Sequence, residues 1–139
     1  MHLDNFNQPA PNSNLLVCDD SPMERMGLVY FLRRAGYNVE EAETGEAALV
    51  KIKQGRFDLL LLDLNMPDLN GFDVLTYIQK TNRNIPVILL SGMAPDDIQD
   101  KMHSLPTQAL PPLLIKPIDP EQLLQVVELQ LHGELPEEA

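Results

Sequence analysis

The sequence predicts a doubly wound α/β domain, in which five parallel strands form a sheet and five helices cover both of its faces. Short apolar runs alternate with longer amphipathic segments along the chain, and strands buried on both faces of a parallel sheet are continuously apolar. Helix-capping residues precede several of the amphipathic segments. A length of 139 residues suits one domain and leaves no room for a separate catalytic or DNA-binding module.

The first part of the chain predicts a strand, a helix and a second strand. The run 15–18 is apolar throughout, and Ser21-Pro22-Met23-Glu24 supplies an N-cap, a proline at the first helical position and a glutamate for a capping box. The run 39–42 is more polar and is expected nearer an edge of the sheet. The apolar stripe of the first helix consists of Leu28, Phe31, Leu32 and Ala35. Gly36 then ends the helix.

The rest of the chain repeats this alternation. Thr44 and Asn70, each followed by glycine, are predicted to cap the second and third helices. A fourth helix is expected at about 96–104, where few apolar residues are available, and Asp119-Pro120-Glu121-Gln122 predicts the start of the last one. The remaining strands are expected at 59–62, 87–90 and 113–115.

Charge and composition narrow the class of protein. Ten Lys and Arg against 21 Asp and Glu give a net charge of −11, which argues against nucleic acid and anionic membranes as partners. The single Cys18 is expected to be a small buried apolar residue. Without a signal-peptide pattern or an apolar stretch of about 20 residues, the protein is expected to be cytoplasmic. Residues 1–14 are expected to be a disordered extension, 15–132 the domain and 133–139 an acidic tail.

Polar side chains follow each of the continuously apolar runs. Asp19-Asp20, Asp63, Ser91 and Lys116-Pro117 stand directly after them, so a parallel sheet would gather these residues at one edge. Three neighbouring carboxylates repel one another unless a divalent cation binds them, and Mg²⁺, with Mn²⁺ as an alternative, prefers oxygen ligands. A lysine and a hydroxyl would hold phosphoryl oxygens. The set suits phosphoryl transfer to a carboxylate, for which Asp63 is the expected nucleophile because it stands alone after LLLL, whereas Asp19 and Asp20 form a metal-binding pair.

The segments LLVCDDSP, LLLLDLNMPDLNGFDVL, VILLSG and LLIKP make the chain similar to the chemotaxis-type receiver domains of two-component response regulators, over residues 15 to about 132. The resemblance implies a flavodoxin-like sheet of strand order 2-1-3-4-5. It also implies that Asp63 accepts the phosphoryl group and that Asp20, Asp63 and the main-chain carbonyl of Asn65 bind Mg²⁺. Asp19 would act through metal-bound water.

The resemblance also assigns the residues that would respond to the phosphoryl group. Ser91 would be the switch hydroxyl, and Lys116 would pair with the phosphate and precede a cis peptide bond to Pro117. Receivers commonly carry an aromatic residue where this chain has Leu113, so the usual aromatic response is in doubt. Met93 and Asn65 would flank the phosphoryl group and tune its lifetime.

The function implied is a phosphorylation-controlled switch rather than an enzyme with its own substrate. A histidine kinase or histidine phosphotransfer protein would phosphorylate Asp63 with the help of the chain's own residues, and a separate downstream protein would bind the switched form. A monomer or weak homodimer is expected. The alternatives are a non-phosphorylated interaction module, a relay within a phosphotransfer chain, a Mg²⁺-dependent phosphohydrolase of the haloacid dehalogenase type, and a receiver fragment of a larger regulator or hybrid kinase.

Overall fold

The computed structural model describes residues 13–66, 71–81, 85–92 and 111–132. Strands and helices alternate along this part of the chain, except where β4 is followed by β5 in the described segments. The predicted helix at 96–104, the predicted cap Asn70, residues 1–12 and the predicted tail 133–139 lie outside the described residues. The elements are β1 (Asn14–Cys18), α2 (Pro22–Arg34), β2 (Asn38–Ala42), α3 (Gly45–Gln54), β3 (Leu59–Asp63), α4 (Gly71–Lys80), β4 (Val87–Ser91), β5 (Leu113–Ile115) and α6 (Pro120–His132).

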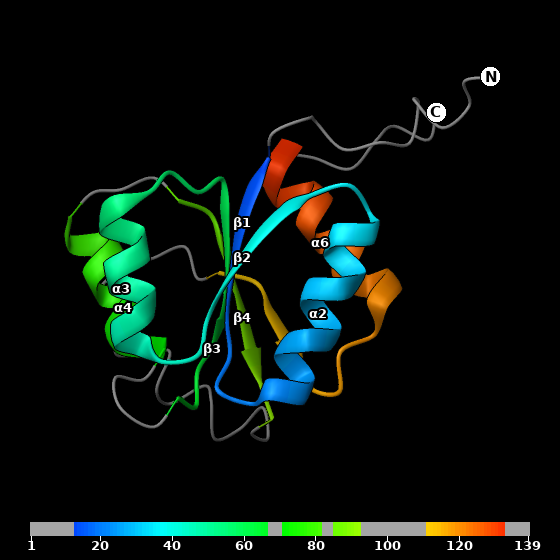
Figure 1. Ribbon diagram of the computed structural model, residues 1–139, viewed down its shortest axis with the longest axis horizontal. Helices are drawn as coiled ribbons and strands as arrows, with labels where there is room; N and C mark the ends of the chain where they lie inside the picture. The colour runs from blue at the N-terminus through cyan, green and yellow to red at the C-terminus, as the bar shows by residue number, and fades with distance from the viewer. Residues whose placement is uncertain (1–12, 67–70, 82–84, 93–110, 133–139) are drawn as a thin grey trace.

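All the strand pairs are parallel, and the strand order is β2-β1-β3-β4-β5. This order confirms the predicted sheet. The more polar β2 lies at an edge, as its composition predicted, and β3 lies at the centre. Figure 1 shows α3 and α4 covering one face of the sheet and α2 and α6 covering the other.

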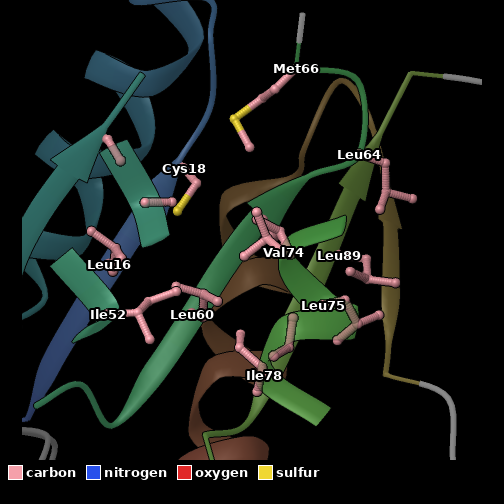
Figure 2. Close-up of a cluster of buried hydrophobic side chains, with 14 residues drawn as sticks. Leu16, Cys18, Ile52, Leu60, Leu64, Met66, Val74, Leu75, Ile78 and Leu89 are labelled. Carbon is pink, nitrogen blue, oxygen red and sulfur yellow. The ribbon is translucent and has the colours of Figure 1, made fainter. Parts of the chain in front are cut away.

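The alternation of side chains along each strand divides the core in two. Leu16, Leu60 and Leu89 face α3 and α4, where Figure 2 shows them packed with Ile52 and Val74. Their strand neighbours contribute to a second cluster with side chains of α2 and α6. Both faces of the sheet are therefore covered by helices, which is why the central strands lack the polar alternation of a half-exposed sheet.

Two helices begin at the predicted N-cap residues. The Ser21 hydroxyl accepts a hydrogen bond from the Glu24 N–H at 3.4 Å, and the Thr44 hydroxyl accepts one from the Ala47 N–H at 3.0 Å. Gly36, which follows α2, has a φ of 106°, a conformation that glycine adopts without steric cost. The predicted start and end of α2 are confirmed.

The structure differs from the sequence prediction at the strand ends. β1 begins at Asn14 rather than Leu15, because Asn14 pairs with Asn38 and its N–H donates to Asp58 Oδ2 at 2.7 Å. β3 and β4 each include the polar residue that follows the apolar run, Asp63 and Ser91. Among the described helices, none is long and apolar enough to cross a membrane.

Candidate functional site

The register of the sheet brings the polar strand ends together. Cys18 of β1 pairs with Leu62 of β3, so Asp19 and Asp63 follow at equivalent positions on adjacent strands. Asp63 in turn pairs with Leu90 of β4, the residue directly before Ser91. Residues that are far apart in the sequence therefore meet at the carboxyl edge of the central strands, where ligands of doubly wound sheets bind.

Three carboxylates form a cluster at this edge. Oxygen atoms of Asp19, Asp20 and Asp63 all lie within 4.8 Å of one another. Asp19 and Asp63 are buried, with 0% and 2% of their surface exposed, whereas Asp20 is exposed. Two carboxyl groups are thus held away from water and a third faces the solvent.

Lys116, which directly follows β5, provides positive charge to this cluster. Its Nζ lies 3.1 Å from Asp63 Oδ2, 3.1 Å from Asp19 Oδ2 and 2.6 Å from Glu24 Oε1. Its side chain is only 16% exposed. One largely buried ammonium group is therefore shared by carboxylates from β3, from the loop after β1 and from α2.

Tight backbone turns fix the second oxygen of each buried aspartate. The Ser21 N–H donates to Asp19 Oδ1 at 2.9 Å, and the Asn65 N–H donates to Asp63 Oδ1 at 3.0 Å. Each donor lies two residues beyond its acceptor, which is the geometry of an Asx turn. The carboxylate planes are therefore positioned by the residues immediately after each strand.

The electrostatic environment raises the pKa values of two groups in this site. Burial is the main reason that the pKa of Asp19 lies above its ordinary value, and the Ser21 N–H and Lys116 counteract it. Burial alone would lower the pKa of Lys116, but the hydrogen bond to Glu24 and the charges of Asp63 and Asp19 outweigh it and raise that pKa. Lys116 is consequently cationic at neutral pH.

The oxygen atoms of the cluster fit a hard divalent cation. Asp19 Oδ2 is buried and accepts no hydrogen bond, although Lys116 Nζ is its ionic neighbour at 3.1 Å. The cluster offers further carboxylate oxygens from Asp20 and Asp63. Three carboxylates this close together, one of them with a buried oxygen that accepts no hydrogen bond, are consistent with Mg²⁺ binding.

The other predicted site residues occupy different positions around this cluster. Ser91 is fully buried at the end of β4, and its carbonyl accepts a hydrogen bond from the Lys116 N–H at 2.8 Å. The Lys116–Pro117 peptide bond is cis, the conformation that the resemblance implies. Leu113 is half-buried at the start of β5 and packs on the core beside α3 and α4, away from the carboxyl edge. Met93 lies outside the described residues.

Cys18 precedes the acidic cluster and belongs to the core. It is fully buried, as predicted. Burial, with smaller contributions from Asp19 and Asp63, raises the pKa of its thiol. Such a thiol stays protonated and packs as a small apolar side chain.

Two residues of α2 that sequence reasoning did not assign to the site also contact it. The sequence predicts Glu24 only as part of a capping box, yet its carboxylate binds Lys116. Arg25 donates to the Asp19 carbonyl at 2.6 Å and pairs with Glu41 at 3.0 Å. No local pattern reveals the contacts of Glu24 with Lys116 and of Arg25 with Glu41, because these partners lie 92 and 16 positions away in the sequence.

A mainly apolar pocket of about 300 Å³ adjoins the acidic cluster. It lies between α2 and the segment that leads from β5 into α6, with Met23 and Phe31 on one side and Ile118 and Leu123 on the other. Asp19, Glu24 and Lys116 form its polar end. Glu24 and Lys116 thus line the pocket, and Lys116 also contacts Asp63.

Comparisons with known proteins agree with this arrangement. A family model described as response regulator receiver domain matches residues 15–128. Protein PilH of Pseudomonas aeruginosa is 33% identical over 123 residues, which cover 87% of this chain and 99% of that protein. The gliding motility regulatory protein of Myxococcus xanthus is 35% identical over 121 residues, or 86% of this chain and 15% of that protein.

The comparison of structures gives a similar result. Response regulator protein TrrA of Thermotoga maritima, solved in complex with Mg²⁺-BeF, has a TM-score of 0.74 and 31% identity, over 86% of this chain and 99% of that one. Several curated relatives are much longer, and the chain spans from 7% to 42% of their length.

Proposed function

This chain belongs to the response regulator receiver domain family and so acts in two-component signalling, and from that premise we propose that Asp63 is its phosphoacceptor. The phosphodonor is a histidine kinase or a histidine phosphotransfer protein. Phosphorylation of Asp63 then changes the affinity of the chain for a downstream partner. The single observation that carries this proposal is the placement of Asp63 beside Lys116 within the acidic cluster.

The position of Asp63 in the sheet supports its choice over the other two aspartates. β3 lies between β1, which precedes Asp19 and Asp20, and β4, which ends in Ser91. A phosphoryl group on Asp63 would therefore have Ser91 on the neighbouring strand β4, and the Lys116 ammonium group already lies 3.1 Å from the Asp63 carboxylate. Asp19 and Asp20 follow β1 and so lie one strand further from Ser91, which makes them poorer acceptors.

The proposed step is a displacement at phosphorus. A carboxylate oxygen of Asp63 forms the new O–P bond, the P–N bond to the donor imidazole breaks, and the imidazole nitrogen takes up a proton. Lys116 stabilises the negative charge on the transferred group, and the Asn65 N–H holds the Asp63 carboxylate in place at 3.0 Å. These residues assist the chain's own phosphorylation and turn over no separate substrate.

Asp20, Asp63 and the main-chain carbonyl of Asn65 are proposed to hold Mg²⁺, with Asp19 acting through a metal-bound water. Bound Mg²⁺ would supply positive charge against the phosphoryl oxygens. Asp20 is the exposed member of the cluster, so it can contact a cation without further burial of its charge. Ser91 is proposed to move toward the phosphoryl group, and Leu113, Asn65 and Met93 to tune the response.

The phosphoacceptor role is tested by intact-mass measurement. Wild-type protein and Asp63→Asn are incubated with Mg²⁺ and phosphoramidate, a small donor that contains a P–N bond. The wild-type protein is expected to gain the mass of one phosphoryl group and Asp63→Asn to gain none. An unmodified wild-type protein that is folded and binds Mg²⁺ would instead favour an interaction module that works without phosphorylation.

A further inference from the structure

Glu24 makes a contact that the capping function of its position does not explain. In a capping box, the glutamate at the third helical position reaches back to the N–H of the N-cap residue. Here the Ser21 N–H donates to Asp19 Oδ1 at 2.9 Å, and Glu24 Oε1 lies 2.6 Å from Lys116 Nζ. The Glu24 side chain is thus directed toward the site rather than toward the start of its own helix.

The contact with Glu24 is the shortest of the three ion pairs that Lys116 makes. Asp19 and Asp63 lie at 3.1 Å from the ammonium group and are buried, whereas the Glu24 side chain is 50% exposed. The hydrogen bond to Glu24 helps to raise the pKa of Lys116. Because Glu24 already faces water, it is the most easily displaced of the three partners.

A phosphoryl group on Asp63 would bring additional negative charge to the same ammonium group. An ammonium group has three hydrogen-bond donors, and three carboxylates already surround the one on Lys116. A phosphoryl oxygen must therefore share or replace one of these partners. Glu24 is the partner that is most easily replaced, because its released carboxylate can turn into solvent. A released Asp19 or Asp63 carboxylate would stay buried without its positive partner.

We propose that Glu24 is a positioning residue that competes with the incoming phosphoryl group for Lys116 and so slows the phosphorylation of Asp63. This inference rests on the proposed function, because it assigns a control to that same site. The Glu24–Lys116 pair favours the unphosphorylated state, and phosphorylation releases Glu24 from Lys116. The release also alters the polar end of the pocket between α2 and α6.

The test measures the initial rate of phosphorylation by phosphoramidate at saturating Mg²⁺ in four proteins. Glu24→Gln keeps the size of the side chain and removes its charge, and Glu24→Asp keeps the charge but shortens the reach to Lys116. Glu40→Gln is the matched control, because Glu40 forms an ion pair of 3.0 Å with Lys51 on the surface. Wild-type protein completes the set, and thermal unfolding shows that each variant is folded.

Both Glu24 variants are expected to be phosphorylated roughly two- to fivefold faster than wild type, the size expected from the loss of a partly exposed ion pair. Glu40→Gln is expected to match wild type. If Glu24→Gln is no faster than wild type, or if Glu24→Asp retains the wild-type rate, competition for Lys116 is overturned. If the wild-type protein itself is not phosphorylated, the proposed function fails, and this inference fails with it.

Discussion

Lys116 is the side chain on which the charges of the site converge, because three carboxylates lie within 3.1 Å of its ammonium group. Asp19 and Asp63 are almost completely buried, and a buried carboxylate needs a positive partner to offset its lost hydration. The lysine therefore has a structural role in the unphosphorylated protein as well as its proposed role in binding the phosphoryl group.

Lys116→Met is expected to lower the free energy of unfolding by about 3 kcal/mol in the presence of a chelator, because two buried carboxylates lose their cation. Lys51→Met removes an ion pair of 3.0 Å between exposed groups and is expected to cost less than about 1 kcal/mol. Urea denaturation at neutral pH measures both values. Equal losses in the two variants would contradict the structural role of Lys116.

The residues after the strands were predictable because each polar side chain directly follows an apolar run. In a parallel sheet, that local signal is enough to place Asp19, Asp63, Ser91 and Lys116 at one edge. The contact of Glu24 with Lys116 spans 92 positions in the sequence. It depends on how the end of β5 approaches α2, so the sequence suggested a cap and not a site residue.

At the scale of the element, α2 connects the acidic cluster to the core. Its N-cap Ser21 also donates to Asp19, while Val29 and Leu32 are buried against the sheet. The predicted apolar stripe included Leu32 but omitted Val29. The other predicted members, Leu28, Phe31 and Ala35, pack against the same cluster but are only partly buried. Helical periodicity thus predicted which face of α2 packs on the sheet, but it missed Val29, one of the two buried residues of that face.

Replacement of Gly27 and of Gly36 by alanine is expected to change the stability of the protein in opposite directions. Gly27 lies within α2, and a Cβ added there meets nothing within 4 Å. Gly27→Ala is therefore expected to stabilise the protein by about 1 kcal/mol through helix propensity. Gly36 has a φ of 106°, so Gly36→Ala is expected to destabilise it by about 1 kcal/mol.

Chemical denaturation of the two glycine variants beside wild type measures both changes. The experiment tests whether the positive φ of Gly36 requires glycine. Gly27→Ala is the matched comparison, because Gly27 lies within the helix that Gly36 follows. If Gly36→Ala proves as stable as Gly27→Ala, glycine is not required at the end of α2, and the described backbone there would be contradicted.

At the scale of the whole molecule, a sheet with two buried faces holds the acidic cluster and Lys116 at the carboxyl ends of its strands. β1, β3 and β4 are almost entirely apolar, and all their residues except Asn14 are buried, which allows their ends to be held in register. The strand order follows from the resemblance of the sequence and is confirmed. The packing of Glu24 and Arg25 could not be predicted, because it requires the relative positions of α2, β2 and β5.

If the acidic cluster holds a divalent cation as proposed, the stability of the whole domain is expected to depend on that cation. A cation that binds only the folded state stabilises it by roughly 1.4 kcal/mol at ten times its Kd. Mg²⁺ is expected to raise the Tm of wild type and of Asp73→Asn, whose carboxylate is exposed on α4. Asp20→Asn is expected to lose most of this increase, because Asp20 belongs to the cluster.

Thermal unfolding over a Mg²⁺ titration provides this measurement. Asp20 is exposed, so its substitution removes a proposed ligand with little effect on the core. An equal Mg²⁺ response in Asp20→Asn and Asp73→Asn would place the cation away from the three carboxylates and would contradict the proposed metal site.

The central claim, that Asp63 receives the phosphoryl group, is tested most directly by locating the modified residue. Borohydride reduces an aspartyl phosphate to homoserine, and peptide mass spectrometry then identifies the position at which homoserine occurs. After phosphorylation of the wild-type protein with phosphoramidate and Mg²⁺, homoserine is expected at position 63 alone. Homoserine at position 19 or 20, with an unmodified aspartate at 63, would contradict the claim.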